Sequence, residues 1–182
     1  MRVAAIDCGT NSIRLLIADP GDAGRLVDVV REMRIVRLGQ GVDRTGRLAP
    51  EAIERTREAL VEYAELIDKH GAAAVRMVAT SATRDAANRD EFTAMVRGVL
   101  GADPEVITGA EEAELSFAGA VAGLPGAPAP VLVADIGGGS TELVLGNGRL
   151  RSHSMDIGCV RMTERHLRAD PPTAEQIGRA HV

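Results

Sequence analysis

Apolar and polar residues alternate at strand-like spacing through the first part of the chain. The alternation predicts strands at Val3–Ile6, Ile13–Ala18 and Leu26–Leu38. From Pro50 onward the apolar residues recur at helical spacing instead, until Gly71 supplies a glycine suited to end a helix. The chain is therefore expected to open with a meander of strands followed by a long helix.

Strands and helices continue to alternate after this helix. Further strands are expected at Val75–Ala79, Glu105–Ile107, Val131–Ala134, Thr141–Leu145 and about Leu150–Met155. Further helices are expected from Asn88 to Gly101, from Thr108 to about Gly123, from about Cys159 to Leu167 and from Thr173 onward. This order predicts an α/β fold with helices over buried, aliphatic sheets.

The one marked break in composition is the segment Leu124–Pro130, which is rich in Pro, Gly and Ala. We interpret it as a linker between domains. The predicted organisation is therefore a first lobe at 1–124, a linker at 125–130 and a second lobe at 131–182. The second lobe repeats the opening strands of the first and then stops, which predicts that it is incomplete.

The last residues, 177–182, are similar to one translated reading frame of a common short-read sequencing adapter. We therefore expect an artefactual end on a fragment, with no part in the fold. Independently obtained DNA of the parent gene, with an intact reading frame ending at Val182, would contradict this expectation.

Composition and charge narrow the classes of function. Of the 182 residues, 45% are hydrophobic, the net charge is −5 and the pI is about 5.4, which argues against nucleic acid or a membrane surface as the main partner. The sequence shows no signal-peptide pattern and no apolar run of membrane-spanning length, so we expect a cytoplasmic protein. Cys8 and Cys159 lack metal-like spacing, and a reactive thiol at Cys8 is the less favoured interpretation.

The most informative stretch holds three consecutive glycines between two apolar runs. The backbone N–H groups of Gly137, Gly138 and Gly139 are able to converge on an anion because no side chain obstructs them. The hydroxyls of Ser140 and Thr141 extend this set of donors. The pattern predicts a phosphate-binding loop between two strands.

The same pattern occurs near the N-terminus, where Asp7–Ile17 aligns without a gap on Asp135–Leu145. Asp and Gly recur at the same places, and hydroxyl and aliphatic residues recur close by. Chance or two ordinary glycine-turn hairpins explain this less well, because both loops follow an Asp and neither has two-residue hairpin chemistry. Two matching loops predict two halves of one site that holds a phosphate from both sides.

Two carboxylates flank the second loop, Asp135 before it and Glu142 after it. Divalent cations such as Mg²⁺ prefer oxygen ligands of this kind. The pair is therefore able to hold a cation against a bound phosphate.

Two further polar stretches lie at the ends of predicted strands. Thr80–Arg84 occupies the position where ligands bind in α/β sheets, so a functional Arg84 is favoured over a surface arginine. Thr108 and Glu111 form a capping-box pattern that turns Glu111 back on the helix start and leaves Glu112 to face a cleft. From these residues alone, both glutamates could equally well complement the helix dipole.

Taken together, the motifs resemble the exopolyphosphatase and guanosine pentaphosphate phosphatase family. They are Ile6–Leu15, Thr80–Arg84, Ile107–Ala113 and Asp135–Glu142, and the resemblance extends to about Pro172. That family belongs to the actin, sugar-kinase and heat-shock ATPase superfamily. The resemblance implies an α/β, actin-like (ribonuclease H-like) two-lobed fold with mixed sheets flanked by helices and, here, an incomplete second lobe.

The resemblance also implies roles in the hydrolysis of a terminal phosphoric anhydride. Glu112 matches the catalytic base that activates water, and Arg84 matches an arginine that faces the phosphate chain. Asp135 and Glu142 match acids that bind the divalent cation and the water. Asp7 looks like an equivalent metal-binding acid in the other lobe. The implied phosphate cradle consists of Gly9, Thr10, Asn11, Ser12, Gly137, Gly138, Gly139, Ser140 and Thr141.

The resemblance therefore implies an exopolyphosphatase that removes the end phosphate of inorganic polyphosphate with Mg²⁺ and water. The same reaction on guanosine pentaphosphate (pppGpp) is the nearest alternative, because the motifs do not separate the two substrates. Alternatives of another class are a superfamily kinase, which the Thr80–Arg84 and Glu111–Ala113 motifs disfavour, and a non-catalytic sensor of phosphate or nucleotide. A homodimer is expected for the full-length protein, and weak or no activity for a fragment.

Overall fold

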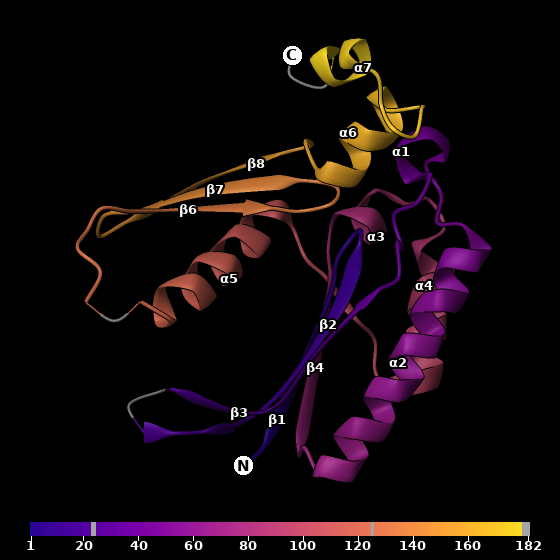
Figure 1. The fold of residues 1–182 in the computed structure, drawn as a ribbon. Coiled ribbons are helices and arrows are strands. Elements are labelled where there is room, and N and C mark those ends of the chain that lie inside the picture. The colour runs from indigo at the N-terminus through magenta and orange to yellow at the C-terminus, as the bar shows by residue number, and fades with distance from the viewer. Residues whose placement is uncertain (23–24, 125, 180–182) are drawn as a thin grey trace. The chain divides into compact units, whose positions relative to one another are not determined.

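Two compact units make up the fold, and each combines a β-sheet with helices (Figure 1). The computed structural model describes residues 1–22, 25–124 and 126–179. The first unit is Met1–Thr108 and the second is Gly109–Val182. Among the described residues, the first sheet has five strands and the second has three. The predicted α/β class, with sheets flanked by helices, is confirmed.

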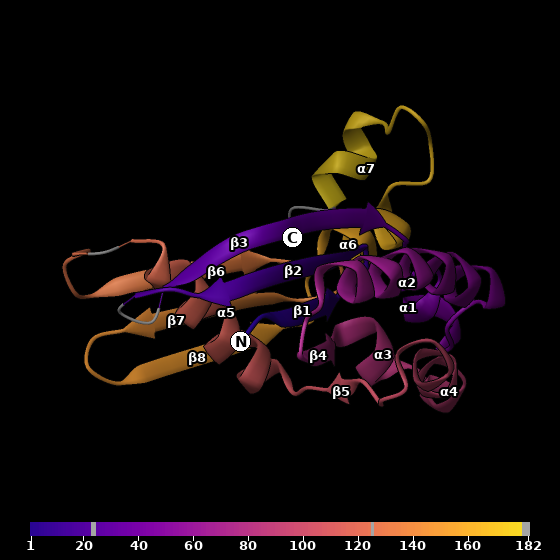
Figure 2. The same cartoon turned by 90° about the horizontal axis from the view of Figure 1, so that it is seen from below.

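The sheet of the first unit is mixed, in the order β3-β2-β1-β4-β5 (Figure 2). Its strands are β1 (Val3–Cys8), β2 (Ser12–Pro20), β3 (Leu26–Ile35), β4 (Ala74–Ala79) and β5 (Glu105–Val106). The first three form the predicted antiparallel meander, and β4 and β5 extend the sheet in parallel from β1. Because β1 is central and parallel to β4, the segments after both strands start at the same edge, where ligands bind in α/β sheets.

Helix α2 is the main cover of this sheet and packs against β2 and α4 (Figure 1). The helices of the first unit are α1 (Val42–Thr45), α2 (Pro50–His70), α3 (Ser81–Asp85) and α4 (Arg89–Leu100). The buried residues of α2 recur every three to four positions, at Ala52, Thr56, Ala59, Leu60, Tyr63 and Ile67. This spacing gives one buried face, as the sequence predicted. The short helices α1 and α3 were not predicted.

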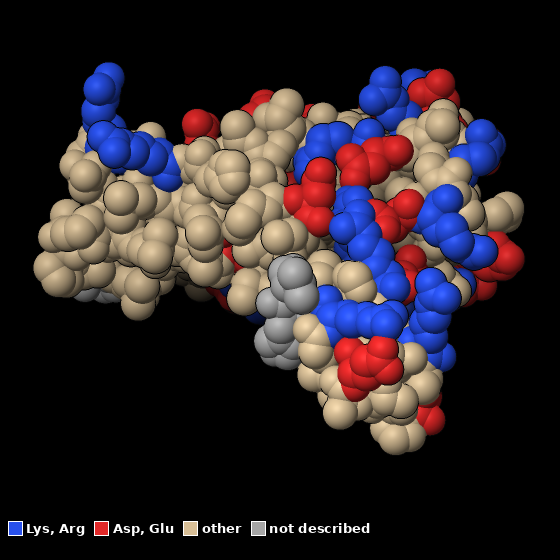
Figure 3. All heavy atoms as spheres, turned by 90° about the horizontal axis from the view of Figure 1, so that it is seen from above, with Lys and Arg blue, Asp and Glu red and all other residues tan. Residues whose placement is uncertain are grey.

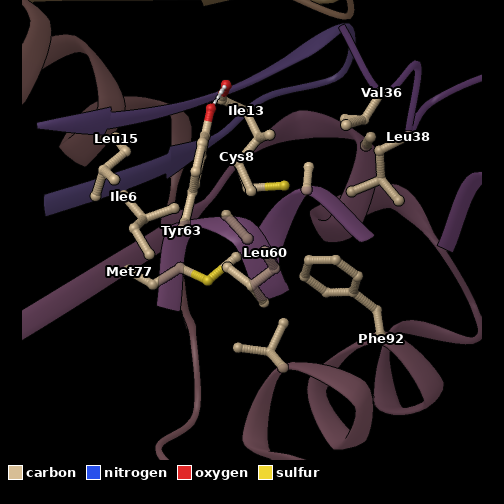
Figure 4. Close-up of a cluster of buried hydrophobic side chains, with 14 of the residues drawn as sticks. Ile6, Cys8, Ile13, Leu15, Val36, Leu38, Leu60, Tyr63, Met77 and Phe92 are labelled. Carbon is tan, nitrogen blue, oxygen red and sulfur yellow. Dashed lines mark hydrogen bonds between the residues drawn. The ribbon is translucent and has the colours of Figure 1, made fainter. Parts of the chain in front are cut away.

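The hydrophobic core of the first unit lies between its sheet and the helices α2 and α4 (Figure 4). Cys8 and Ile13 face it from the strands, and Leu60 and Phe92 face it from the helices. Tyr63 is completely buried there, and its hydroxyl donates a hydrogen bond of 3.0 Å to the backbone carbonyl of Ile13. This bond ties α2 to the start of β2, next to the first glycine loop.

In the second unit, an antiparallel sheet in the order β6-β7-β8 carries helix α5 on one face (Figure 1). The elements are α5 (Gly109–Ala122), β6 (Val131–Ile136), β7 (Thr141–Gly146), β8 (Leu150–Met155), α6 (Cys159–His166) and α7 (Ala174–Arg179). Val144 is completely buried beneath α5, whereas Leu132 and Ile136 are exposed on the other face. The ring of Phe117 lies so close to Gly146 that a Cβ there would overlap it.

The division between the two units differs from the lobe boundary expected from the sequence. The expected first lobe at 1–124 includes α5, but α5 packs on all the strands of the second sheet and therefore groups with the second unit. The close packing of Phe117 on Gly146 is the physical reason. Pro125 of the expected linker at 125–130 lies outside the described residues, as do residues 180–182 of the end at 177–182.

Charged side chains of both signs are interspersed on the face drawn in Figure 3. Exposed ion pairs occur in the first unit, such as Arg97 with Asp103 and Arg76 with Glu105, each at 2.7 Å. Hydrogen bonds from these arginines hold the pKa of both carboxyls below their usual range. Pairs this exposed add little stability. Among the described helices, none is both long and apolar enough to cross a membrane.

Replacing Tyr63 with phenylalanine tests the tie between α2 and β2. Tyr63→Phe removes one buried hydrogen bond, so we expect the free energy of unfolding to fall by about 0.5–1.5 kcal/mol. Tyr63→Leu also creates a cavity and should cost more. Urea denaturation followed by circular dichroism measures both variants. A Tyr63→Phe protein as stable as the parent would show that the hydrogen bond adds nothing.

Candidate phosphate site

Two loops of the same geometry close the hairpins β1-β2 and β6-β7. In the first, the N–H of Gly9 donates to the carbonyl of Ser12 at 2.9 Å. In the second, the N–H of Gly137 donates to the carbonyl of Ser140 at 2.9 Å. The strand registers match as well, so that four residues connect the paired strands in both hairpins. The duplication inferred from the sequence is therefore present in the backbone.

The carbonyl groups of the second loop are bound by the start of helix α6. Backbone N–H groups at this end of the helix donate to the carbonyls of Gly137 and Gly138 at distances between 2.9 and 3.1 Å. The Nε of Arg161 donates to the third carbonyl, that of Gly139, at 2.8 Å. Three consecutive loop carbonyls are thus held by α6.

This anchoring determines where the N–H groups of the loop point. In a trans peptide the carbonyl and the following N–H point to opposite sides, so a carbonyl held by α6 turns the next N–H away from the helix. The N–H groups concerned belong to Gly138, Gly139 and Ser140, and no described residue accepts a hydrogen bond from any of them. Neighbouring N–H groups turned to one side of a loop form a nest for an anion.

Gly158, directly before α6, allows the helix to approach the loop this closely. A Cβ at this position would lie well under 3.0 Å from the backbone of Gly138, which no side chain tolerates. Gly158 was not predicted from the sequence. The signal that could have found it is an apolar residue followed by glycine after the third strand of each meander, Leu38-Gly39 and Ile157-Gly158.

The first loop is anchored in a similar way by the segment that follows β3. The N–H groups of Val36 and Arg37 donate to the carbonyl of Asn11 at 3.1 and 2.9 Å. The N–H of Gly39 donates to the carbonyl of Thr10 at 2.9 Å, and a side chain at Gly39 would overlap Thr10. The N–H that follows each of these carbonyls is therefore turned away from that segment.

Two of the predicted hydroxyl donors, those of Thr10 and Thr141, are not open to an anion. The hydroxyl of Thr10 is buried and forms no hydrogen bond with any described residue. The hydroxyl of Thr141 donates to the carbonyl of Ile157. At these two positions the backbone, rather than the hydroxyl, is the part of the loop that an anion could meet.

Asp135 and Glu142 are direct cross-strand partners on β6 and β7. Residues paired in this way hold their side chains next to each other on one face of the sheet, where like charges repel. The hydroxyl of Ser116 donates to Asp135 at 2.6 Å and that of Ser154 donates to Glu142 at 2.8 Å, so one oxygen of each carboxylate is oriented. Glu142 is only 1% exposed. Two opposed, oriented carboxylates suit a divalent cation that also takes phosphate and water ligands.

Asp7 occupies the position equivalent to Asp135, but its cross-strand partner is Arg14 rather than an acid. The two side chains form an ion pair with Nη1 and Oδ2 3.8 Å apart. The first unit thus has an ion pair where the second has two acids. Among the described residues, no three His, Cys, Asp or Glu side chains gather closely enough to hold a metal ion. A cation bound at Asp135 would therefore need further ligands from substrate or water.

Helix α5 carries Glu112 and packs against the residues that orient the acids. Ser116, one turn after Glu112, donates to one acid, and Gly109, one turn before it, lies against the residue that donates to the other. A Cβ at Gly109 would lie only 2.7 Å from the hydroxyl of Ser154. Since residues three and four apart share a helix face, Glu112 lies on the face turned toward the sheet. Glu112 is half-buried and Glu111 is exposed.

Arg84 lies in α3, shortly after the end of β4, and is half-buried. Its Nη1 donates to the carbonyl of Ile107 at 2.9 Å, so it differs from a solvated surface arginine. The structure groups the predicted site residues by unit: Arg84, Asp7 and the first loop in one, and Glu112, the paired acids and the second loop in the other.

Cys8 ends β1 and is buried in the core. Burial raises the pKa of its thiol, and the negative charge of Asp7 acts in the same direction. A thiol that stays protonated is a poor nucleophile. The structure therefore does not support the interpretation of Cys8 as a reactive residue.

Comparison with known proteins gives consistent matches over nearly the whole chain. The sequence profile of the Ppx/GppA phosphatase family matches residues 16–181. Exopolyphosphatase 2 of Mycobacterium tuberculosis is 65% identical over 188 aligned residues, which cover 98% of this chain and 59% of that protein. The chain therefore spans little more than half the length of the curated relatives that it matches.

Solved structures agree with these sequence matches. An exopolyphosphatase-like protein is 53% identical with a TM-score of 0.93, covering 98% of this chain and 57% of that one. An exopolyphosphatase from Cytophaga hutchinsonii is 34% identical with a TM-score of 0.90, covering 98% and 58%. A Ppx/GppA family member from Aquifex aeolicus is 42% identical with a TM-score of 0.77, covering 98% and 58%. The α/β fold implied by the resemblance, with mixed sheets flanked by helices, is confirmed as that of Ppx/GppA proteins.

Gly158→Ala tests the close approach of α6 to the second loop. The added Cβ must push the helix or the loop aside, so we expect the free energy of unfolding to fall by about 1–3 kcal/mol. Gly119→Ala is the matched control, because Gly119 lies within α5 with nothing within 4 Å of the added Cβ. Helix propensity predicts a gain of up to about 1 kcal/mol there. Equal unfolding free energies of the two variants in urea would contradict the close approach.

Proposed function

The chain belongs to the Ppx/GppA phosphatase family, and on that premise we propose that the whole protein is an exopolyphosphatase. The reaction is hydrolysis of the terminal phosphoric anhydride bond of inorganic polyphosphate, which yields orthophosphate and a chain shorter by one phosphate. The observation that supports this most is the second loop, whose N–H groups at Gly138, Gly139 and Ser140 are turned away from α6 without acceptors among the described residues. Such a loop suits a phosphate end group.

In this proposal the second loop binds the terminal phosphate, and the phosphate-binding role of the first loop stays a prediction from the sequence. In both loops the donors are backbone N–H groups, which are fixed before the substrate arrives. Donors that are already oriented need no rearrangement when negative charge builds up during the reaction, and phosphoryl transfer depends mainly on such positioning. Arg84 stays a predicted partner of the phosphate chain, to which it would add a positive charge.

Mg²⁺ is the proposed cofactor, held by Asp135 and Glu142. Their cross-strand pairing and the hydroxyls of Ser116 and Ser154 leave one oxygen of each carboxylate for a cation. When bound, Mg²⁺ neutralises charge on the phosphate oxygens, and most of its remaining ligands come from phosphate and water. Asp7 is paired with Arg14, and its role at the cation stays a prediction from the sequence.

Glu112 is the proposed general base. It removes a proton from the attacking water as the water oxygen bonds to the terminal phosphorus and the bridging P–O bond breaks. The leaving phosphate takes up the electron pair of that bond. The position of Glu112 supports this role, because two residues on the same helix face lie close to the paired acids. Ser116 donates to Asp135, and Gly109 lies against Ser154, the residue that donates to Glu142.

The same reaction on pppGpp remains the nearest alternative, since both substrates end in a phosphoric anhydride. A superfamily kinase and a non-catalytic sensor remain the alternatives of another class. The cytoplasmic location and the homodimer stay predictions.

Phosphate release from long-chain polyphosphate in the presence of Mg²⁺ tests the proposed activity. Glu112→Gln keeps the size of the side chain but removes the base, so we expect the rate to fall by about 10²–10⁴-fold. Glu111→Gln is the matched control, and this exposed neighbour should leave the rate unchanged within a few-fold. Because the chain spans 59% of its relative, the same substitutions are made in a full-length relative.

Each outcome of this assay separates the alternatives. An unchanged rate in Glu112→Gln contradicts the assigned base. Faster release from pppGpp than from polyphosphate favours the nucleotide as substrate. ATP consumption that depends on an acceptor favours a kinase, and binding without turnover in both proteins favours a sensor.

Mg²⁺ should stabilise the chain even without substrate, because it relieves the repulsion between the paired acids. At a Mg²⁺ concentration ten times the dissociation constant, the gain is about 1.4 kcal/mol, which is measurable as a rise in melting temperature. Asp135→Asn should abolish this rise, and in a chelator it should be at least as stable as the parent. Asp156→Asn, an exposed acid of the same unit, is the control and should keep the rise. A parent whose melting temperature does not change with Mg²⁺ would overturn the cation site. So would an Asp135→Asn variant whose melting temperature still rises.

A further inference from the structure

We propose that Arg161 is a positioning residue for the second phosphate loop. It holds the peptide between Gly139 and Ser140 in the orientation that directs the N–H of Ser140 toward the anion. This inference rests on the proposed function, because it assumes that the loop binds a phosphate group. The residue acts through the backbone and is not assigned a contact with the substrate.

The reach of helix α6 explains why a side chain is needed at this point. Backbone N–H groups at the start of α6 bind the carbonyls of Gly137 and Gly138, but the next carbonyl is bound by a side-chain nitrogen. Arg161 binds two of these carbonyls: its backbone N–H donates to that of Gly138 at 3.1 Å, and its Nε donates to that of Gly139 at 2.8 Å. One residue therefore fixes two successive peptides of the loop.

The chemistry of the guanidinium suits this task better than that of other side chains. Arginine stays charged at all relevant pH values, and its planar donors are rigid. A charged donor forms a stronger hydrogen bond to a carbonyl than a neutral one does. Hydrogen bonds in a chain also polarise one another, so the bond to the Gly139 carbonyl strengthens the Ser140 N–H as a donor. The effect on the anion is greatest at Ser140 and smaller at Gly138.

The first loop is held differently, which makes the second loop the more strongly polarised of the two. The carbonyls of Thr10 and Asn11 accept hydrogen bonds from backbone N–H groups of Val36, Arg37 and Gly39. At the second loop a charged side chain is added to the backbone donors. We therefore assign the phosphate on which charge develops during the reaction to the second loop.

Amide NMR of the ¹⁵N-labelled chain, titrated with sodium tripolyphosphate and Mg²⁺, tests this inference. In the parent, the amide resonances of Gly138, Gly139 and Ser140 should shift on binding. Arg161→Gln should weaken binding by about ten-fold or more, as expected for a lost hydrogen bond to a charged group, and should reduce the Ser140 shift most. Arg161→Lys keeps the charge without the planar fork and should give intermediate binding. Arg168→Gln, which removes an exposed arginine after α6, is the control and should match the parent.

The outcomes separate this inference from the proposed function. Parent binding that is unchanged in Arg161→Gln, with the same Ser140 shift, overturns the role of Arg161 and leaves the loop intact as the phosphate site. A parent whose loop amides do not respond to tripolyphosphate overturns the phosphate site itself. If Arg161→Gln unfolds, the comparison of Arg161→Lys with the parent decides, and equal binding with equal Ser140 shifts contradicts the inference.

Discussion

Trans peptide geometry links the carbonyl groups that α6 binds to the N–H groups that the second loop presents. A loop of glycines has many accessible conformations, and three glycines in a row would ordinarily be a source of conformational entropy. Here each carbonyl is bound by α6, so each peptide has one orientation. The glycines are small enough to leave the N–H side open, and α6 supplies the order that they lack. Gly158 completes the arrangement, since any side chain there would separate the helix from the loop.

Helix α5 plays a comparable role for the acids. It packs on the second sheet through small contacts, with Gly109 against Ser154 and Gly146 beneath the ring of Phe117. These contacts place Ser116 where it binds Asp135 and put Glu112 on the same helix face. The second unit therefore gathers a phosphate loop, a pair of acids and a candidate base. Their mutual placement rests on contacts within one unit and on backbone geometry more than on long, flexible side chains.

Local pattern predicted much of this fold, and tertiary contacts account for the differences. The opening meander and α2 follow from strong periodicity and a terminal glycine. The third strand was expected to reach Leu38 but ends at Ile35, because the next N–H groups bind the first loop instead of continuing the ladder with β2. The helical pattern of α5 shows one apolar face but does not say which sheet covers it. The sequence therefore placed α5 in the first lobe, whereas the structure groups it with the second unit.

Within the candidate site, the sequence identified residues that belong to a repeated motif. The two loops were predictable because their Asp-Gly pattern recurs without a gap. Capping geometry alone left Glu111 and Glu112 equally possible, and the family resemblance assigned the base to Glu112. Gly158 and Arg161 were not predicted, because each acts on a loop some twenty residues away and their importance depends on the approach of α6.

The most direct test of the account is a crystal structure of the chain with tripolyphosphate and Mg²⁺. The account predicts that the terminal phosphate accepts hydrogen bonds from the N–H groups of Gly138, Gly139 and Ser140. It also predicts a cation between that phosphate and the carboxylates of Asp135 and Glu142. A phosphate bound elsewhere, or a loop whose carbonyls leave α6 and turn toward the anion, would contradict it.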